Sequence, residues 1–247
     1  YKRQEYDRLV VNPAIEKTVV QARELEQEIS RLQQESGYPY ILNIDVANRA
    51  NPVKGKIIMS NLCSEILQPQ TPSVLNDDLS YHEVGTDISC NLGSTNIVNL
   101  LKSEDFAASV DAMVRALTTV TDLESVEEVP TVNKGNRLYH TIGLGAMGLH
   151  TALALHQIKY GSKESLEFTE AYFLALNYYS LVSSNRIARE RHETFYEFAD
   201  SRYADGSYFS PYVEQDFVFR FPKIAAIFKN MPIPTKEDWK VLREKVM

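Results

Sequence analysis

Cysteine is scarce in this sequence of 247 residues: Cys63 and Cys90 are the only two. So few thiols exclude a secreted disulfide-rich scaffold and are typical of a reducing compartment, so we expect a cytoplasmic protein. Long apolar runs are also missing, because none approaches the roughly 20 residues that a membrane-spanning helix needs. We therefore expect no membrane-spanning segment.

Positive charge is in deficit as well. The sequence has 26 lysines and arginines against 33 acidic residues, which gives a formal net charge of -7. No basic stripe stands out, so we expect no binding to nucleic acid. The hydrophobic fraction of 44% and the charged fraction of 24% are those of an ordinary globular protein with a substantial core. The sequence begins with Tyr1 and not with an initiator methionine or a signal peptide, so we expect a piece of a longer protein.

Helices are predicted where apolar residues recur every three or four positions. The first such pattern follows Asn12 and Pro13, a favourable N-cap and a favourable first helical residue, and stops at a glycine. The predicted helices run from Pro13 to Gly37, from near Ser103 to Val120, from Ser165 to about Glu193, and from the capping residue Thr235 onward.

Short runs of β-branched and aromatic residues alternate with these helices and predict strands. They lie at residues 39–46 and 87–93, with a weaker one at 136–142. Helices interleaved with strands indicate the α/β class. By pattern the chain divides into a leading helical segment (1–37), a segment of strands and a loop (38–101), and a mainly helical part (102–247).

The stretch Ser60–Ile66 places Cys63 two residues from Asn61 on one side and from Glu65 on the other. In an extended or tightly looped backbone, residues two apart point the same way, so an amide, a thiol and a carboxyl could face one small space. They would supply a hydrogen-bonding group, a sulfur reactant and a proton acceptor. The alternative is a buried structural cysteine beside two solvated polar residues. Spacing alone leaves both interpretations open.

The second cysteine, Cys90, does not form a C-x-x-C motif with Cys63. Either the two are unrelated buried thiols, or both line one cavity, with Cys90 near a reacting group held by Cys63. The register of the segments that carry them decides between these possibilities, and sequence does not give that register.

Three glycines, Gly143, Gly145 and Gly148, match the G-x-G-x-x-G pattern of dinucleotide-binding proteins. That fingerprint also requires a strand ending in an acid about 20 residues further on. The acids at that distance, Glu164 and Glu167, fall at the start of a predicted helix. Close helix packing through small residues is therefore the preferred interpretation. The histidines lack the spacing of a metal pair, and we expect no metal site.

Taken in order, these segments resemble class I ribonucleotide reductase large (catalytic) subunits. Ser60–Ile66 resembles the finger-loop signature of that family, and Ser89–Gly93 resembles the strand that carries one of its reducing cysteines. Residues 67–69, Asn96 and residues 142–149 follow in the order found in that family. The sequences at 37–41 and 48–51 most resemble the bacterial class Ib branch. The resemblance implies a ten-stranded α/β barrel, with Cys63 on a central finger loop, of which residues 1–247 would form an incomplete central section.

The resemblance also implies roles for single residues. Cys63 would carry a thiyl radical that abstracts the 3′ hydrogen of a ribonucleoside diphosphate, and Glu65 would be the general base on the 3′ hydroxyl. Asn61 would bind a sugar hydroxyl, and Leu92 would line the sugar pocket. Cys90 would be one of two redox-active thiols that reduce the 2′ position, its partner cysteine lying outside this chain. The implied substrate-contacting set comprises Asn61, Leu62, Cys63, Ser64, Glu65 and Leu92.

The implied partners lie outside the chain. The chain itself would bind no cofactor, and a small (beta) subunit with a di-iron or di-manganese tyrosyl radical would supply the radical. A glutaredoxin- or thioredoxin-like reductant would restore the thiols, and the full subunit, an allosteric enzyme, would form a homodimer. The allosteric site, the phosphate loop and the radical-relay tyrosines would lie mostly or wholly elsewhere, so we expect the 247 residues alone to be inactive. Two alternatives are a redox-responsive structural or interaction module, in which Cys63 and Cys90 form a regulatory disulfide, and a dinucleotide-dependent oxidoreductase that uses residues 143–148.

Overall fold

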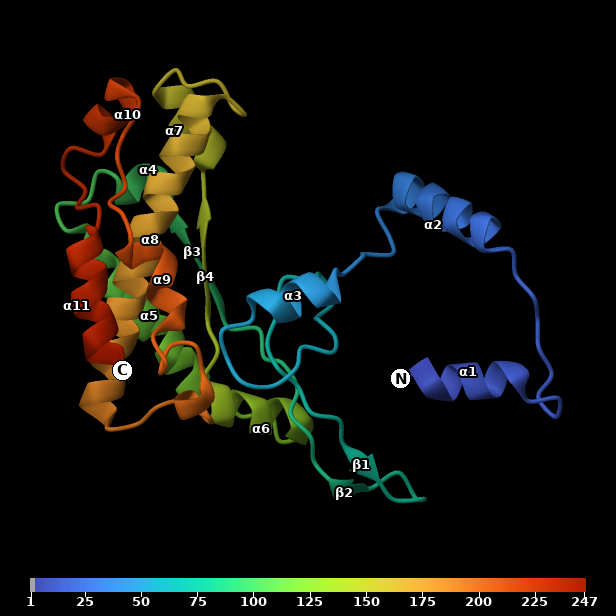
Figure 1. Cartoon of the computed structure of the whole chain (residues 1–247). Coiled ribbons are helices and arrows are strands. Elements are labelled where there is room, and N and C mark those ends of the chain that lie inside the picture. The colour runs from blue at the N-terminus through green and yellow to red at the C-terminus, as the bar shows by residue number, and fades with distance from the viewer. Residues whose placement is uncertain (1–2) are drawn as a thin grey trace. The chain divides into compact units, whose positions relative to one another are not determined.

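The computed structural model describes residues 3–247, with side chains from residue 6 onward, and the chain divides after Leu42 into two compact units (Figure 1). The first unit contains α1 (Arg3–Val11) and α2 (Ala22–Ser36). Gly37 ends α2 as predicted, in the left-handed conformation with its N–H bonded to the Gln33 carbonyl.

The predicted start of this helix at Pro13 is wrong, because α2 begins at Ala22. The Asn12 side chain accepts a hydrogen bond from the Ala14 N–H at 3.0 Å, but it caps only a turn. The β-branched residues at 18–20 follow, and such residues lose side-chain freedom in a helix. That cost separates the turn from α2.

The second unit opens with α3 (Ile44–Ala50), where the sequence predicts a strand over 39–46. That prediction is wrong because a polar side chain outside the apolar run decides the local structure. The Asn48 amide donates to the Ile57 carbonyl at 2.8 Å and accepts from the Ile57 N–H at 2.9 Å. This side chain takes both backbone groups of Ile57, which a neighbouring strand would otherwise bond.

Two small sheets follow. The first pairs β1 (Val74–Leu75) with β2 (Tyr81–Glu83) in antiparallel fashion. The second pairs β3 (Leu92–Asn96) with β4 (Gly143–Met147) in parallel, with Leu92 opposite Gly143. Parallel strands need a crossover, and it consists here of α4 (Ile97–Leu100), α5 (Phe106–Leu123) and α6 (Pro130–Tyr139). This mixture of helices and parallel strands is the α/β class that the sequence predicts.

Helices make up most of the rest of the second unit, and Figure 1 shows the long α8 beside α5 and α11. In order they are α7 (Leu149–Leu155), α8 (Lys163–Arg191), η1 (Phe198–Asp200), η2 (Ser207–Phe209), α9 (Ser210–Val213), α10 (Pro222–Ile227) and α11 (Lys236–Val246). The long helix and the last helix are confirmed, the latter with a capping box between Thr235 and Asp238. The helix predicted near Ser103 begins at Phe106, because Asp105 serves as its N-cap.

The main core lies between the β3/β4 sheet and helices α5, α7, α8 and α10. Phe106 and Val110 of α5 are buried there together with Phe168 and Tyr172 of α8. The Tyr172 hydroxyl lies 2.8 Å from the Thr95 hydroxyl of β3, which satisfies a buried polar group inside the apolar core. The sheet is thereby fixed to α8.

A buried carboxylate joins α8 to the segment before α10. The Glu167 side chain is 0% exposed and accepts hydrogen bonds from the Arg220 N–H, the Arg220 Nε–H and the Phe221 N–H at 2.9–3.0 Å. Burial raises the pKa of Glu167, but these three bonds outweigh it and hold the pKa below its ordinary value.

Two further predictions are wrong. The weak strand predicted at 136–142 is the end of α6 and the turn after it, since Pro130 starts a helix that continues to Tyr139. The strand predicted at 87–93 begins only at Leu92, so Cys90 lies in an irregular segment. The backbone there bonds to α6 instead of a strand, because the Asp87 N–H donates to the Thr131 carbonyl.

The three glycines do not pack two helices together. Gly143 and Gly145 lie inside β4, and Gly148, with φ +81°, precedes α7. The Leu92 side chain crosses Gly143 so closely that a Cβ there would lie 2.4 Å from the Leu92 Cδ2. Gly143 therefore allows close packing against Leu92, and Gly148 is the only one of the three between β4 and α7. Because Gly143 and Gly145 lie within the strand, the three glycines do not together form a phosphate-binding turn.

Among residues 3–247, no helix combines the length and the apolarity needed to cross a bilayer.

Candidate thiol site

The stretch around Cys63 forms a tight loop closed at its neck. The Ser60 hydroxyl donates to the Ile66 carbonyl at 2.7 Å, and the Ile66 N–H donates to the Asn61 Oδ1 at 3.1 Å. Inside the neck, the Ser64 N–H donates to the Asn61 carbonyl at 3.1 Å, and Ser64 adopts a left-handed φ of +62°. The backbone therefore reverses within four residues and places Cys63 at the exposed tip.

The side chains of this loop do not all point to one place. The Asn61 Oδ1 turns toward the loop backbone, where it also accepts from the Ser60 hydroxyl. Leu62 is 82% exposed. Glu65 points away from the neck, and its Oε1 lies 3.9 Å from the Sγ of Cys90. The structure thus brings Glu65 and Cys90 together across 25 positions of the sequence.

Both cysteines are free thiols at the surface, so the interpretation of either as a buried structural cysteine is wrong. Local desolvation raises the pKa of the Cys90 thiol, and the negative charge of the nearby Glu65 carboxylate raises it further. At neutral pH this environment keeps the hydrogen on the Cys90 sulfur, which suits a thiol that donates hydrogen.

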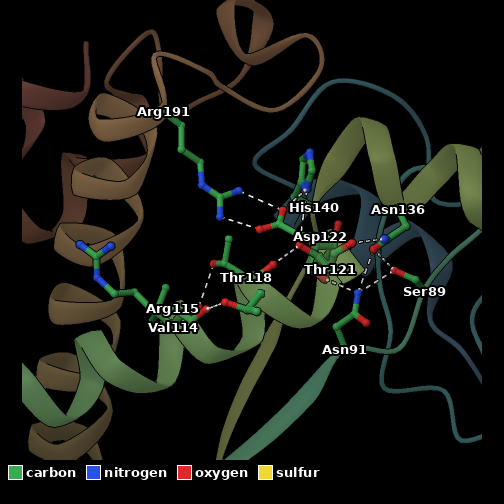
Figure 2. Close-up of polar contacts among 12 residues, drawn as sticks. Ser89, Asn91, Val114, Arg115, Thr118, Thr121, Asp122, Asn136, His140 and Arg191 are labelled. Carbon is green, nitrogen blue, oxygen red and sulfur yellow. Dashed lines mark hydrogen bonds and ion pairs between the residues drawn. The ribbon is translucent and has the colours of Figure 1, made fainter. Parts of the chain in front are cut away.

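The segment that carries Cys90 is held from its buried side (Figure 2). Ser89 and Asn91, on either side of the cysteine, are 4% and 5% exposed, whereas Cys90 itself is exposed. The Ser89 hydroxyl and the Asn91 amide both donate to the Oδ1 of Asn136 on α6 at 3.0 Å. Sequence reasoning missed these three residues. The available signal was a polar residue on each side of Cys90 in a stretch predicted as a strand.

Leu92 is the first residue of β3 and follows Cys90 by two positions. It is 50% exposed, and its backbone pairs with Gly143 of β4. Leu92 thus lies at the end of the sheet that is continuous with the thiol segment.

Comparison with known proteins matches the chain to one family. Residues 2–247 match the family described as "Ribonucleotide reductase, barrel domain". The chain is 42% identical over 243 residues to the ribonucleoside-diphosphate reductase subunit alpha of Mycoplasma pneumoniae, and 42% identical over 240 residues to that of Bacillus subtilis. Each alignment covers 96% of this chain but 34% of the relative, so the chain spans about a third of their length.

A solved structure has a similar fold. The class Id ribonucleotide reductase alpha subunit of Actinobacillus ureae superposes with a TM-score of 0.56 at 18% identity, covering 91% of this chain and 46% of that one. At this identity the likeness concerns the fold alone, and it agrees with the α/β barrel that the sequence predicts.

Proposed function

Because this chain belongs to the ribonucleotide reductase barrel-domain family, we propose that it forms the central part of a class I catalytic subunit, of the bacterial class Ib type, that reduces ribonucleoside diphosphates to 2′-deoxyribonucleoside diphosphates. The observation that carries this proposal is the approach of Glu65 to Cys90, at 3.9 Å, beside the exposed Cys63. A carboxylate and two free thiols at one surface are the groups that such a reduction requires.

Each group has one role in the proposed reaction. Cys63, as a thiyl radical, takes the 3′ hydrogen from the ribose and returns it at the end, while Glu65 accepts the proton of the 3′ hydroxyl and gives it back when the hydroxyl is restored. Cys90 and a second thiol from outside this chain each give up a hydrogen. The 2′ oxygen leaves as water, a hydrogen takes its place on the carbon, and the two sulfurs form a disulfide. The raised pKa of Cys90 supports this role, because the thiol must keep its hydrogen until it reacts.

The loop geometry supports a positioning role for Asn61. Its Oδ1 is engaged in the loop neck, which leaves the Nδ2 donor for a sugar hydroxyl. Leu62, Cys63 and Ser64 at the tip and Leu92 at the start of β3 complete the proposed substrate-contacting surface.

The source of the radical is proposed to be another protein, as the family resemblance implies. Among residues 3–247, no group of three or more histidine, cysteine, aspartate or glutamate side chains could hold a metal ion. We propose that a small subunit carries the di-iron or di-manganese tyrosyl radical, and that a glutaredoxin- or thioredoxin-like protein reduces the disulfide. The full subunit would act as a homodimer in the cytoplasm, where free thiols persist.

The decisive experiment replaces Cys63 by serine in the full-length catalytic subunit, assayed with its radical-generating partner. We expect deoxyribonucleotide formation to fall to background, because an alcohol does not form the corresponding radical under these conditions. Ribonucleoside diphosphate affinity and the thermal unfolding midpoint should stay unchanged, since Cys63 is exposed and contributes nothing to the core. Turnover by Cys63→Ser at the native rate would refute the proposed function.

A regulatory disulfide between Cys63 and Cys90 is the second candidate, and it is favoured because both are exposed free thiols and Cys90 contacts Glu65, two residues from Cys63. It predicts that mild oxidation of the full-length protein with diamide yields a Cys63–Cys90 cross-link, detected by peptide mass spectrometry, before any other disulfide. If that cross-link does not form and Cys63→Ser abolishes turnover, the regulatory disulfide is refuted and the reductase function is supported.

A further inference from the structure

Helix α6 lies directly against the segment that carries Cys90. The Asp87 N–H donates to the Thr131 carbonyl at 3.0 Å in the first turn of the helix. One turn later, a Cβ on Gly135 would lie 2.0 Å from the Asp87 carbonyl oxygen, so only glycine permits this approach. The start of the thiol segment is thus packed backbone to backbone on α6.

The next residue of α6, Asn136, bonds to both neighbours of Cys90. Its Oδ1 accepts from the Ser89 hydroxyl and from the Asn91 amide, each at 3.0 Å. Its Nδ2 donates to the Thr121 carbonyl at the end of α5, at 2.7 Å. Asn136 is 1% exposed. A buried amide with donor and acceptor both engaged holds its partners firmly, because releasing it leaves several polar groups unsatisfied.

The network continues to the end of α8 (Figure 2). Asp122, next to Thr121, accepts two hydrogen bonds from the guanidinium of Arg191, at 2.9 and 2.6 Å. The Nδ1 of His140 lies 3.5 Å from the Thr121 hydroxyl. Asn136 is therefore connected to two long helices, α5 and α8, and the segment with Cys90 is connected to Asn136.

We propose that Asn136 is a positioning residue that fixes the Sγ of Cys90 opposite Glu65, by clamping Ser89 and Asn91 on the buried side of the segment. The clamp itself is a property of this chain. Its consequence for catalysis rests on the proposed function, in which Cys90 delivers a hydrogen to the substrate and a displaced sulfur would deliver it poorly.

A double-mutant cycle on Cys90 reactivity tests the clamp without any turnover assay. The full-length protein is alkylated with iodoacetamide at pH 8, and modification of Cys90 is followed by peptide mass spectrometry. With Asn136 present, Glu65→Gln is expected to speed Cys90 alkylation about two- to threefold, because a nearby negative charge is removed. In the Asn136→Ala background, Glu65→Gln should leave the Cys90 alkylation rate nearly unchanged, since the sulfur no longer stays beside Glu65.

Two further variants serve as a control and as a replacement for Asn136→Ala. Thr118→Val is the matched control: its hydroxyl bonds to the Val114 carbonyl within α5 and not to the clamp residues Ser89, Asn91 and Asn136, so the two- to threefold effect of Glu65→Gln should persist. If Asn136→Ala does not fold, Ser89→Ala replaces it, because that change removes only the hydroxyl that bonds to Asn136 and Asn91. An undiminished effect of Glu65→Gln in the folded clamp variant overturns the proposal.

Turnover assays separate this proposal from the proposed function. In the reductase reaction, Asn136→Ala should lower kcat about tenfold or more with the substrate KM unchanged, since Asn136 is buried and does not touch substrate. Cys90→Ser should abolish turnover. An inactive Cys90→Ser together with a fully active Asn136→Ala refutes the clamp alone. A fully active Cys90→Ser refutes the function of Cys90 while leaving the alkylation cycle as a valid measurement.

Discussion

Replacing Glu65 by glutamine changes one charge beside the Cys90 thiol and little else. The carboxylate is exposed, lies 3.9 Å from the sulfur, and its negative charge helps to raise the pKa of Cys90. Glutamine has nearly the same shape and keeps an oxygen acceptor but carries no charge. The pKa of Cys90 is therefore expected to fall, but to stay above its ordinary value, because desolvation, the largest cause of the shift, remains.

The size of the effect follows from the distance. Two unit charges about 4 Å apart in water-like surroundings interact by about 1 kcal/mol, and this low-end value applies because Cys90 is exposed. It corresponds to about fivefold more thiolate at a pH below the thiol pKa. A thiolate of lower pKa is also a weaker nucleophile, which reduces the gain in alkylation rate to about two- to threefold.

The assay is the pH dependence of Cys90 alkylation in the full-length protein, measured from pH 6 to pH 10 by peptide mass spectrometry. Glu65→Gln should move the Cys90 profile to lower pH. The control is Glu127→Gln, which removes an equal charge from an exposed residue that is not among the groups acting on Cys90. A Cys90 profile that stays in place in Glu65→Gln, or that moves as far in Glu127→Gln, would mean that the two side chains do not meet in solution.

Three further outcomes concern the frame around the site. Glu167→Gln should destabilise the protein by about 2 kcal/mol, because the backbone N–H groups of Arg220 and Phe221 lose a buried, charged acceptor, lowering Tm by about 4–8 °C. In the matched control, Glu170→Gln, an exposed ion pair is lost for less than about 1 kcal/mol, and equal losses would contradict this account. Since the folded-state pKa of Glu167 is lowered, its contribution is complete above the ordinary value of 4.5 and is lost as pH falls through the lowered pKa, so denaturant midpoints of native and Glu167→Gln proteins should converge in acid. Thr235→Ala should cost about 1 kcal/mol in urea unfolding by removing the α11 cap, and an unchanged midpoint would show that this helix end is held by packing alone.

Local chemistry made some elements predictable. The α11 cap at Thr235 and the apolar stripe of α8 are each encoded within a few adjacent residues, so periodicity and capping rules locate them. Helix α6 was not predicted, because its interior includes Gly135, a poor helix former that is needed for contact with Asp87. A distant contact thus overrides the local preference.

In the candidate site, too, local features could be predicted from the sequence and distant contacts could not. The spacing of Asn61, Cys63 and Glu65 left a reactive site and a buried structural cysteine both open, and the structure places the thiol at an exposed tip. That Glu65 would meet Cys90 depends on how two segments 25 positions apart are held, which no local pattern contains. Asn136 escaped notice for the same reason, because its partners belong to other elements.

The left-handed conformation of Ser64 introduces backbone strain into the loop that carries Cys63. A residue with a side chain pays of order 1 kcal/mol to occupy this region, whereas glycine would occupy it freely. The closed loop therefore carries backbone strain at Ser64, and the hydrogen bonds from the Ser60 hydroxyl and to the Asn61 side chain hold it closed. If a ligand or a partner protein displaced the hydrogen bond to Asn61, Ser64 could leave the left-handed region, and this would lower the free energy of the loop tip. The position of the Cys63 sulfur therefore depends on two hydrogen bonds made several bonds away from it, at the neck of the loop.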